Sequence, residues 1–200
     1  MQAVIRGEIL ERVIRLSPRG WHAGFEPISD LFEGLQEKFG GRAHLYNCAL
    51  YDREGEGEFF IVGNDPGYSS LRRRPLDFPA LYRRTTVPLR TMDSFFDASR
   101  PVHFIKIDVE GAELQVLKGA SALLARDSPV ILFECGKGGY DQFNDSPKEI
   151  YTFLSSLRYG IYEMEDWLKK KDPLSIDVFL RQFESNDNYY FIAACRTLAV

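Results

Sequence analysis

Cysteine is scarce in this sequence, and long hydrophobic runs are missing. The three cysteines, Cys48, Cys135 and Cys195, are widely spaced, and no Cys-x-x-Cys pair occurs. This usage predicts buried, reduced thiols instead of disulfides or a zinc site, and hence a cytoplasmic location. No apolar run approaches the roughly 18 residues that a membrane-spanning helix requires. The N-terminal segment mixes charged with apolar residues, unlike a secretory signal peptide. A membrane partner is therefore not expected.

An excess of positive charge is also absent. The formal net charge is -4, which argues against a general nucleic-acid-binding protein. His22, His44 and His103 show no metal-ligand spacing, so no metal site is expected. No G-x-G-x-x-G motif follows an expected strand, which argues against a nicotinamide-dependent enzyme.

The chain has 200 residues, of which 44% are hydrophobic. These values fit one domain over residues 1–200. The N-terminal pattern of Ile5, Ile9, Val13 and Leu16 predicts that the chain opens with an amphipathic helix.

The most informative pattern is a strand, an acidic corner and a helix. The nearly continuous apolar run at 102–107 predicts a strand that is covered on both faces. Asp108 ends this run, and the pattern from Glu110 onward predicts an amphipathic helix. A second apolar run at 130–133 ends at Glu134. The segment therefore predicts a βαβ unit.

The acidic residues at these strand ends are the first candidates for chemistry. Ligands of open parallel sheets bind beyond the carboxyl ends of the strands, where Asp108, Glu110 and Glu134 are expected to converge. In an alternative interpretation, Asp108 caps the following helix, and Glu110 and Glu113 only complement the helix dipole.

Two earlier segments suggest a nucleotide site. The apolar run at 21–25 ends at Glu26, and a carboxylate at such a position can accept hydrogen bonds from ribose hydroxyls. Amide and backbone groups from Asn47 to Ala49, near the end of the strand expected over residues 43–50, could contact an adenine edge. Helix capping by Glu26 and a purely structural role for Asn47 remain alternatives.

An arginine-rich segment lies between Ser69 and Arg90, with six arginines and a single acidic residue. Its prolines favour a long loop or a short-helix insertion, and such connections often carry function. Arg72 and Arg73, together with Glu134, are therefore candidates for substrate binding, because arginine binds anionic groups in bidentate fashion. A solvated charge run is the alternative.

The C-terminal part predicts two strands, at 160–164 and 189–195, separated by a polar connection. This arrangement is typical of an antiparallel edge on a mostly parallel sheet.

Several segments together resemble the FkbM-type S-adenosylmethionine-dependent methyltransferases. They are GFEP at 24–27, NCALYD at 47–52, GYSSL at 67–71, LRTMDSFF at 89–96, FIKIDVEGAELQVLKGA at 104–120 and ILFEC at 131–135. The resemblance covers about residues 20–135. It implies an α/β, Rossmann-like methyltransferase fold with a seven-stranded mixed sheet. It also implies S-adenosylmethionine as cofactor and a hydroxyl acceptor on a sugar or other small molecule, possibly anionic.

The resemblance also implies roles for individual residues. Glu26 matches the ribose-binding carboxylate of the family pattern. Asp108 and Glu110 match the acidic motif beside the methyl group, where a carboxylate can orient or deprotonate the acceptor.

The family pattern begins with a strand and a D-x-G-x-N-x-G-like turn, and nothing similar precedes Glu26 here. The expectation is that the domain is N-terminally incomplete and that its first strand is missing. The strands at 21–25 and 104–107 would then close up directly, or a partner chain, for example in a homo-oligomer, would supply the strand. A truncated or pseudo-methyltransferase that acts as a non-catalytic binding module is the alternative function.

Overall fold

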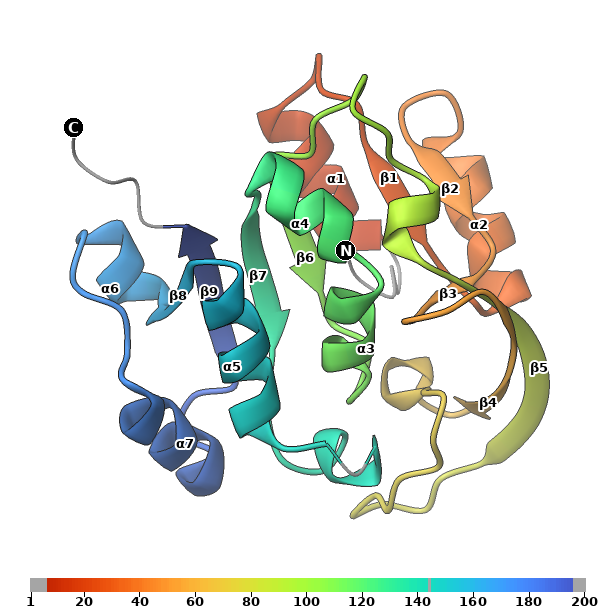
Figure 1. Ribbon diagram of the computed structural model, residues 1–200. Helices are drawn as coiled ribbons and strands as arrows, with labels where there is room; N and C mark the ends of the chain where they lie inside the picture. Colours follow the sequence, from red (N-terminus) through yellow and green to blue (C-terminus); the bar gives the residue numbers. More distant parts are fainter. Residues whose placement is uncertain (1–6, 144, 196–200) are drawn as a thin grey trace.

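The computed structural model describes residues 7–143 and 145–195 and shows an α/β protein (Figure 1). Its helices are α1 (Glu8–Leu16), α2 (Ser29–Phe39), α3 (Glu113–Lys118), α4 (Ser121–Asp127), α5 (Pro147–Ser156), α6 (Met164–Leu168) and α7 (Ile176–Ser185). Its strands are β1 (Ala23–Phe25), β2 (His44–Tyr46), β3 (Ala49–Leu50), β4 (Gly55–Val62), β5 (Tyr82–Arg90), β6 (Phe104–Ile107), β7 (Val130–Glu134), β8 (Tyr159–Glu163) and β9 (Tyr190–Cys195). Among these described helices, none is long and apolar enough to cross a membrane.

The described strands form three separate sheets instead of the single seven-stranded sheet that was expected. The largest has the order β6-β7-β9-β8, a second has the order β3-β5-β4, and β1 pairs only with β2. The β1–β2 and β6–β7 pairs are parallel, as expected. No described strand joins β1 to β6, so among the described strands the β1–β2 sheet is not hydrogen-bonded to the four-stranded sheet.

The C-terminal prediction of an antiparallel addition to the sheet is correct. Strand β9 pairs antiparallel with β7 on one side and with β8 on the other. Helices α5 and α7 cover this part of the sheet, and the rings of Phe133, Phe179 and Phe191 are buried between them. Apolar burial of this kind is the main source of fold stability.

The single helix expected after Glu110 is two helices, α3 and α4. Glu110 and Gly111 lie outside α3 with positive φ values of 58° and 111°. The helices are interrupted at Gly119, where an added Cβ would lie only 2.0 Å from the carbonyl oxygen of Tyr51. Only glycine fits so close to another backbone, and this contact brings the helix pair against the segment after β3.

Two other expectations need correction. The strand expected over residues 43–50 is divided into β2 and β3, and the chain passes from one sheet to another between them. The arginine-rich segment is not entirely a loop or short-helix insertion, because its second half is the nine-residue strand β5. That strand pairs with the whole of β4.

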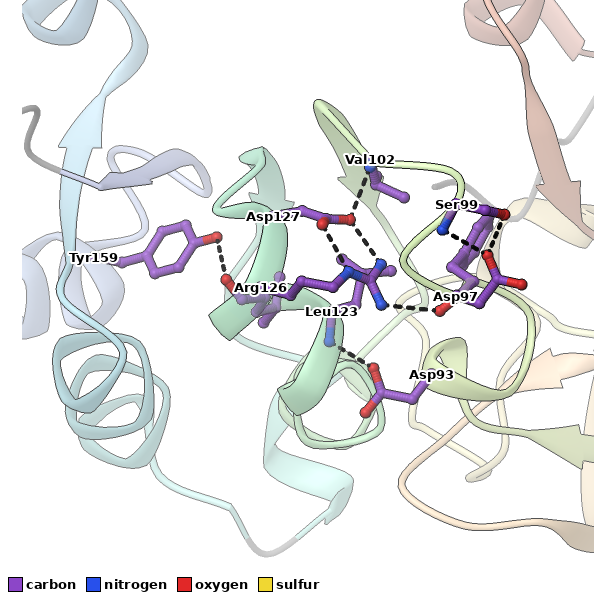
Figure 2. Close-up of polar contacts among 10 residues, drawn as sticks. Asp93, Asp97, Ser99, Val102, Leu123, Arg126, Asp127 and Tyr159 are labelled. Atoms are coloured by element: carbon purple, nitrogen blue, oxygen red, sulfur yellow. Dashed lines mark hydrogen bonds and ion pairs between the residues drawn. The ribbon is translucent and has the colours of Figure 1, made fainter.

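A polar network fixes the connection that leads into β6 (Figure 2). The carboxylate of Asp127, at the end of α4, accepts hydrogen bonds from the backbone N–H of Val102 at 2.9 Å and from Arg126 Nε at 2.7 Å. The hydrogen bond from Arg126 lowers the pKa of Asp127. Asp93 accepts a hydrogen bond from the N–H of Leu123 in the first turn of α4. The network therefore positions the acidic corner indirectly, because it fixes both ends of the β6–α3–α4 unit.

Candidate active site

Three carboxylates meet at the carboxyl ends of β6 and β7. Asp108 directly follows β6, Glu110 lies in the loop before α3, and Glu134 is the last residue of β7. One carboxylate oxygen of each residue lies within 4.8 Å of the others. The parallel pairing of β6 with β7 explains this convergence, because parallel strands end at the same edge of a sheet.

Two cations compensate this negative charge. Lys106 Nζ lies 2.6 Å from Asp108 Oδ2, and Arg74 lies 2.5 Å from Glu110 Oε2. All four side chains are at most 14% exposed, so these ion pairs are poorly screened by water. Asp108 therefore binds Lys106 and is not the cap of α3, whose N-terminus has no side-chain cap.

Burial is the main cause of the raised pKa values of the two glutamates in this cluster. It raises the pKa of Glu110 to about 7, although Arg74 opposes this shift. It raises the pKa of Glu134 to about 9, and the neighbouring Asp108 charge adds to the effect. A protonated Glu134 can donate a hydrogen bond to a neighbouring carboxylate at neutral pH. The corner can therefore hold a proton between Glu134 and Asp108.

Glu113 fixes the loop that carries Glu110. Its buried carboxylate accepts hydrogen bonds from the N–H groups of Val109 and Gly111, both at 3.2 Å. Burial nevertheless raises the pKa of Glu113 to about 7. Glu113 thus orients the backbone around Glu110, a role that is more specific than the dipole effect considered from the sequence.

The segment 70–74 crosses the acidic corner, and Arg74 is its arginine in direct contact with the cluster. Ser70 Oγ donates a hydrogen bond to the Glu110 carbonyl oxygen at 3.0 Å. Arg72 and Arg73 are exposed and lie over the rings of Phe143 and Tyr82, respectively. The structure therefore places these two arginines at the rim, and their substrate contact stays a prediction.

The candidate cofactor residues form a second group at the ends of β1 and β2. Glu26 is only 2% exposed, and its Oε1 accepts a hydrogen bond from the N–H of Ile28 at 2.8 Å. Asn47 Nδ2 donates to the Glu26 carbonyl oxygen at 2.8 Å. Ala49 is buried and, with Val109, lines a cavity of about 40 Å³. Val109 follows Asp108 directly, so the two groups are neighbours at one edge of the fold.

Sequence reasoning did not assign a site role to Lys106 or Arg74. A signal for Lys106 was present, because residues two apart in a strand share a face and the lysine interrupts an apolar run two positions before Asp108. No comparable local signal distinguishes Arg74 from the five other arginines of its segment. Its contact with Glu110 joins residues 36 positions apart.

The site can polarise and position a hydroxyl group. It offers carboxylate acceptors and a proton shared with Glu134, and the adjoining cations balance the charge. Oxygen ligands of this kind also suit magnesium, but Asp108 and Glu110 are already engaged by Lys106 and Arg74.

Comparison with known proteins identifies the family. A search among curated proteins gives no match. A solved structure, methyltransferase FkbM from Methylobacillus flagellatus KT, is similar in fold with a TM-score of 0.54 and 20% sequence identity. The similarity covers 80% of this chain but 37% of that chain. The family model of the methyltransferase FkbM domain matches residues 7–161. The resemblance seen in the sequence is thus confirmed, and the chain belongs to the FkbM methyltransferase domain family.

Proposed function

We propose that this protein uses S-adenosylmethionine to methylate a hydroxyl oxygen on a sugar or another small molecule. The observation that carries the proposal is the convergence of Asp108, Glu110 and Glu134 at the ends of two parallel strands. Membership of a methyltransferase family supplies the reaction class. The carboxylates supply the means to bind and orient a hydroxyl acceptor.

The residues beside this corner suit the adenosine part of the cofactor. Glu26 is a buried carboxylate at a strand end, the type of group that binds a ribose diol. The adjoining cavity is lined by apolar groups such as Phe25, Ala49 and Val109, which suit a flat purine ring. At about 40 Å³ it is far smaller than the roughly 300 Å³ or more of a typical ligand site. Side chains must therefore shift when an adenine ring enters.

The bound cofactor supplies an electrophilic methyl group. Asp108 orients the acceptor hydroxyl and accepts its proton as the oxygen is methylated. Lys106 holds the Asp108 carboxylate in place, and the protonated Glu134 shares a hydrogen bond with it. Arg74 fixes Glu110 beside the same position. Methyl transfer depends strongly on alignment of the reacting groups, so this fixed corner supplies much of the catalytic effect.

The test measures formation of S-adenosylhomocysteine from S-adenosylmethionine with panels of monosaccharides and polyols. Asp108→Asn is expected to lower turnover by about 10²-fold or more per folded molecule. Asp97→Asn is the matched control, because Asp97 is exposed and precedes β6 at the opposite end of the strand. Normal turnover by Asp108→Asn, with only a lower melting temperature, would assign Asp108 a purely structural role.

A non-catalytic binding module is the second candidate function. The favouring observation is that the Glu26 carboxylate already accepts a hydrogen bond from the N–H of Ile28, the residue before α2, as a structural residue would. Calorimetric titration with S-adenosylmethionine distinguishes the two functions. Absence of binding at millimolar cofactor would favour the module over the enzyme.

A further inference from the structure

Arg74 is held from several sides in the segment that crosses the acidic corner. The hydroxyl of Tyr82 donates a hydrogen bond to its carbonyl oxygen at 2.5 Å. Its Cζ lies 4.9 Å from the centre of the Tyr68 ring, a cation–π contact that restricts the position of the guanidinium group. The side chain is only 12% exposed. Arg74 is therefore a preorganised and nearly buried cation beside the candidate reaction centre.

The known contacts of this guanidinium group lie at Nη1. This atom donates a hydrogen bond to Glu110 Oε2 at 2.5 Å. Gly139 packs against the same atom, because a Cβ added to this glycine would lie 2.8 Å from Nη1. The Nε–H lies on the other edge of the planar group, where it forms a fork with Nη2. Among the described residues, the buried Nε of Arg74 has no hydrogen-bond partner.

A buried N–H donor without a partner is unfavourable, because folding removes its hydrogen bond to water and supplies no replacement. The Nε/Nη2 edge is suited to one class of partner. Its two parallel N–H groups match the two oxygens of a carboxylate or a phosphate, and such bidentate pairs are among the stronger hydrogen-bonded contacts. The exposed Arg72 and Arg73 add positive charge nearby, which attracts an anion to this part of the surface.

Glu110 is a weak competitor for the charge of Arg74. Burial raises the pKa of Glu110 to about 7, so a fraction of this glutamate is protonated at neutral pH. Ordinary carboxylic acids, with pKa values near 4, and phosphate esters keep their negative charge at that pH. An ionised ligand group would therefore interact with Arg74 more strongly than the protonated glutamate does.

We propose that the Nε/Nη2 edge of Arg74 binds an oxyanion, a carboxylate or a phosphate, of a ligand that occupies the acidic corner. The inference rests on the proposed function, because it names a subsite of the same site. Two ligands of that reaction can carry the group: an acidic acceptor sugar and S-adenosylmethionine, through its methionine carboxylate. The sequence singled out Arg72 and Arg73, whereas the structure assigns the oxyanion to Arg74. Because Nε is buried, binding requires a small shift of the groups that cover it.

The first experiment compares methyl glucuronoside with methyl glucoside, which differ only in a carboxylate or a hydroxymethyl group on the ring. NMR titration of the isotope-labelled 200-residue chain at pH 7 and low salt gives both dissociation constants without any turnover. The charged probe is expected to bind at least about tenfold more tightly, the scale of a charge-assisted hydrogen-bond pair. The Nε–H resonance of Arg74 should shift with the charged probe and not with the neutral one.

Three variants assign the effect to this edge. Arg74→Lys keeps the charge but removes the fork, so the advantage of the charged probe should fall to about threefold or less. Arg84→Lys is the matched control, because Arg84 is an exposed arginine of β5 whose ion pair with Glu58 lies on the surface, and it should bind both probes as the wild-type protein does. Glu110→Gln should strengthen binding of the charged probe at least about threefold, because it removes the carboxylate that competes for Arg74. A purely structural Arg74 predicts no such gain.

Titration with S-adenosylmethionine distinguishes the two sources of the oxyanion. If Arg74→Lys weakens binding of methyl glucuronoside alone, the oxyanion belongs to the acceptor. If it weakens binding of S-adenosylmethionine alone, the oxyanion is the carboxylate of the cofactor. Either result supports an oxyanion at the Arg74 edge. If Arg74→Lys does not fold, the Nε–H shift in the wild-type protein and the gain in Glu110→Gln decide the question.

Two results would overturn the inference. The first is that the carboxylate gives no advantage to the sugar probe and that Arg74→Lys leaves the affinity for S-adenosylmethionine unchanged. The second is that Arg74→Lys and Arg84→Lys lose the charged probe equally, or that Glu110→Gln gains nothing, which would mean attraction by the general positive charge.

Failure of the proposed function is a separate outcome. Selective binding of the charged probe, with no S-adenosylhomocysteine formed from any acceptor, keeps the subsite and removes the enzyme assignment. Methylation of the neutral glucoside as efficiently as the glucuronoside, by wild-type protein and Arg74→Lys alike, keeps the enzyme and removes the acceptor subsite.

Discussion

Replacement of Lys106 by methionine tests whether the acidic corner depends on a buried counter-charge. Lys106 is the cation nearest Asp108, at 2.6 Å, and the two side chains are 6% and 14% exposed. Methionine keeps most of the volume of the lysine stem, so the substitution removes the charge with little change in packing. Asp108 would then remain beside Glu110 and Glu134 without its nearest compensating charge.

The expected loss in the free energy of unfolding is about 3 kcal/mol at pH 9, the lower end of the range for breaking a buried ion pair. The loss should be smaller at pH 5. At that pH Glu110 and Glu134, whose pKa values are raised to about 7 and about 9, are mostly protonated and repel Asp108 less. The double variant Lys106→Met/Asp108→Asn should regain at least about 1 kcal/mol, because it removes the uncompensated charge.

Urea denaturation of the four proteins of this double-mutant cycle, at pH 5 and pH 9, measures these differences. Lys169→Met is the matched control, since its ion pair with Glu165 is exposed and should contribute no more than about 0.5 kcal/mol. A loss for Lys106→Met no larger than that of the control would refute the reasoning. It would mean that water already solvates Asp108 in the folded protein.

Three further predictions concern Glu134, Gly119 and Glu26. The folded-state pKa of Glu134 is raised from 4.5 to about 9, so its contribution to stability is fully present below about pH 4.5 and is lost as pH rises through 9. Glu134→Gln should therefore flatten this part of the stability–pH curve, measured by urea denaturation. An unchanged slope would contradict the assignment. Gly119→Ala should lower the free energy of unfolding by about 2 kcal/mol or more, because its Cβ would meet the Tyr51 carbonyl oxygen. The control Gly34→Ala in α2, which has open space around it, should raise the free energy of unfolding by about 0.5–1 kcal/mol. In a protein that binds S-adenosylmethionine, Glu26→Gln should weaken binding by about 1.5–3 kcal/mol in calorimetric titration, and an equal Kd would remove Glu26 from the ribose site.

Local sequence patterns predicted most of the elements that build the site. Apolar runs located β6 and β7, and the carboxylates after them were expected to converge because parallel strands end at one edge. The antiparallel pairing of β8 with β9 was also predicted, from two apolar runs separated by a polar connection. These predictions succeeded because burial on a strand produces a pattern within a few neighbouring residues.

Other features depend on contacts between distant segments and were wrong or absent in the sequence interpretation. The amphipathic pattern continued past Gly119, but the helix is interrupted there, at a glycine that lies against the Tyr51 backbone. Apolar character continued from β2 to β3, although these strands pair with different sheets. A one-dimensional pattern records which face is apolar but not which element covers it.

The sequence by itself determined the family of this protein and the presence of an acidic corner at the end of a buried strand, because both are recorded in contiguous motifs such as FIKIDVEG. Only the tertiary structure decided how the charges of that corner are balanced. Arg74 reaches Glu110 across 36 positions of sequence, and burial of the cluster raises the pKa of Glu134. The physical reason is that ion pairing and desolvation depend on distances in space and on exclusion of water, which arise only when separate segments pack together.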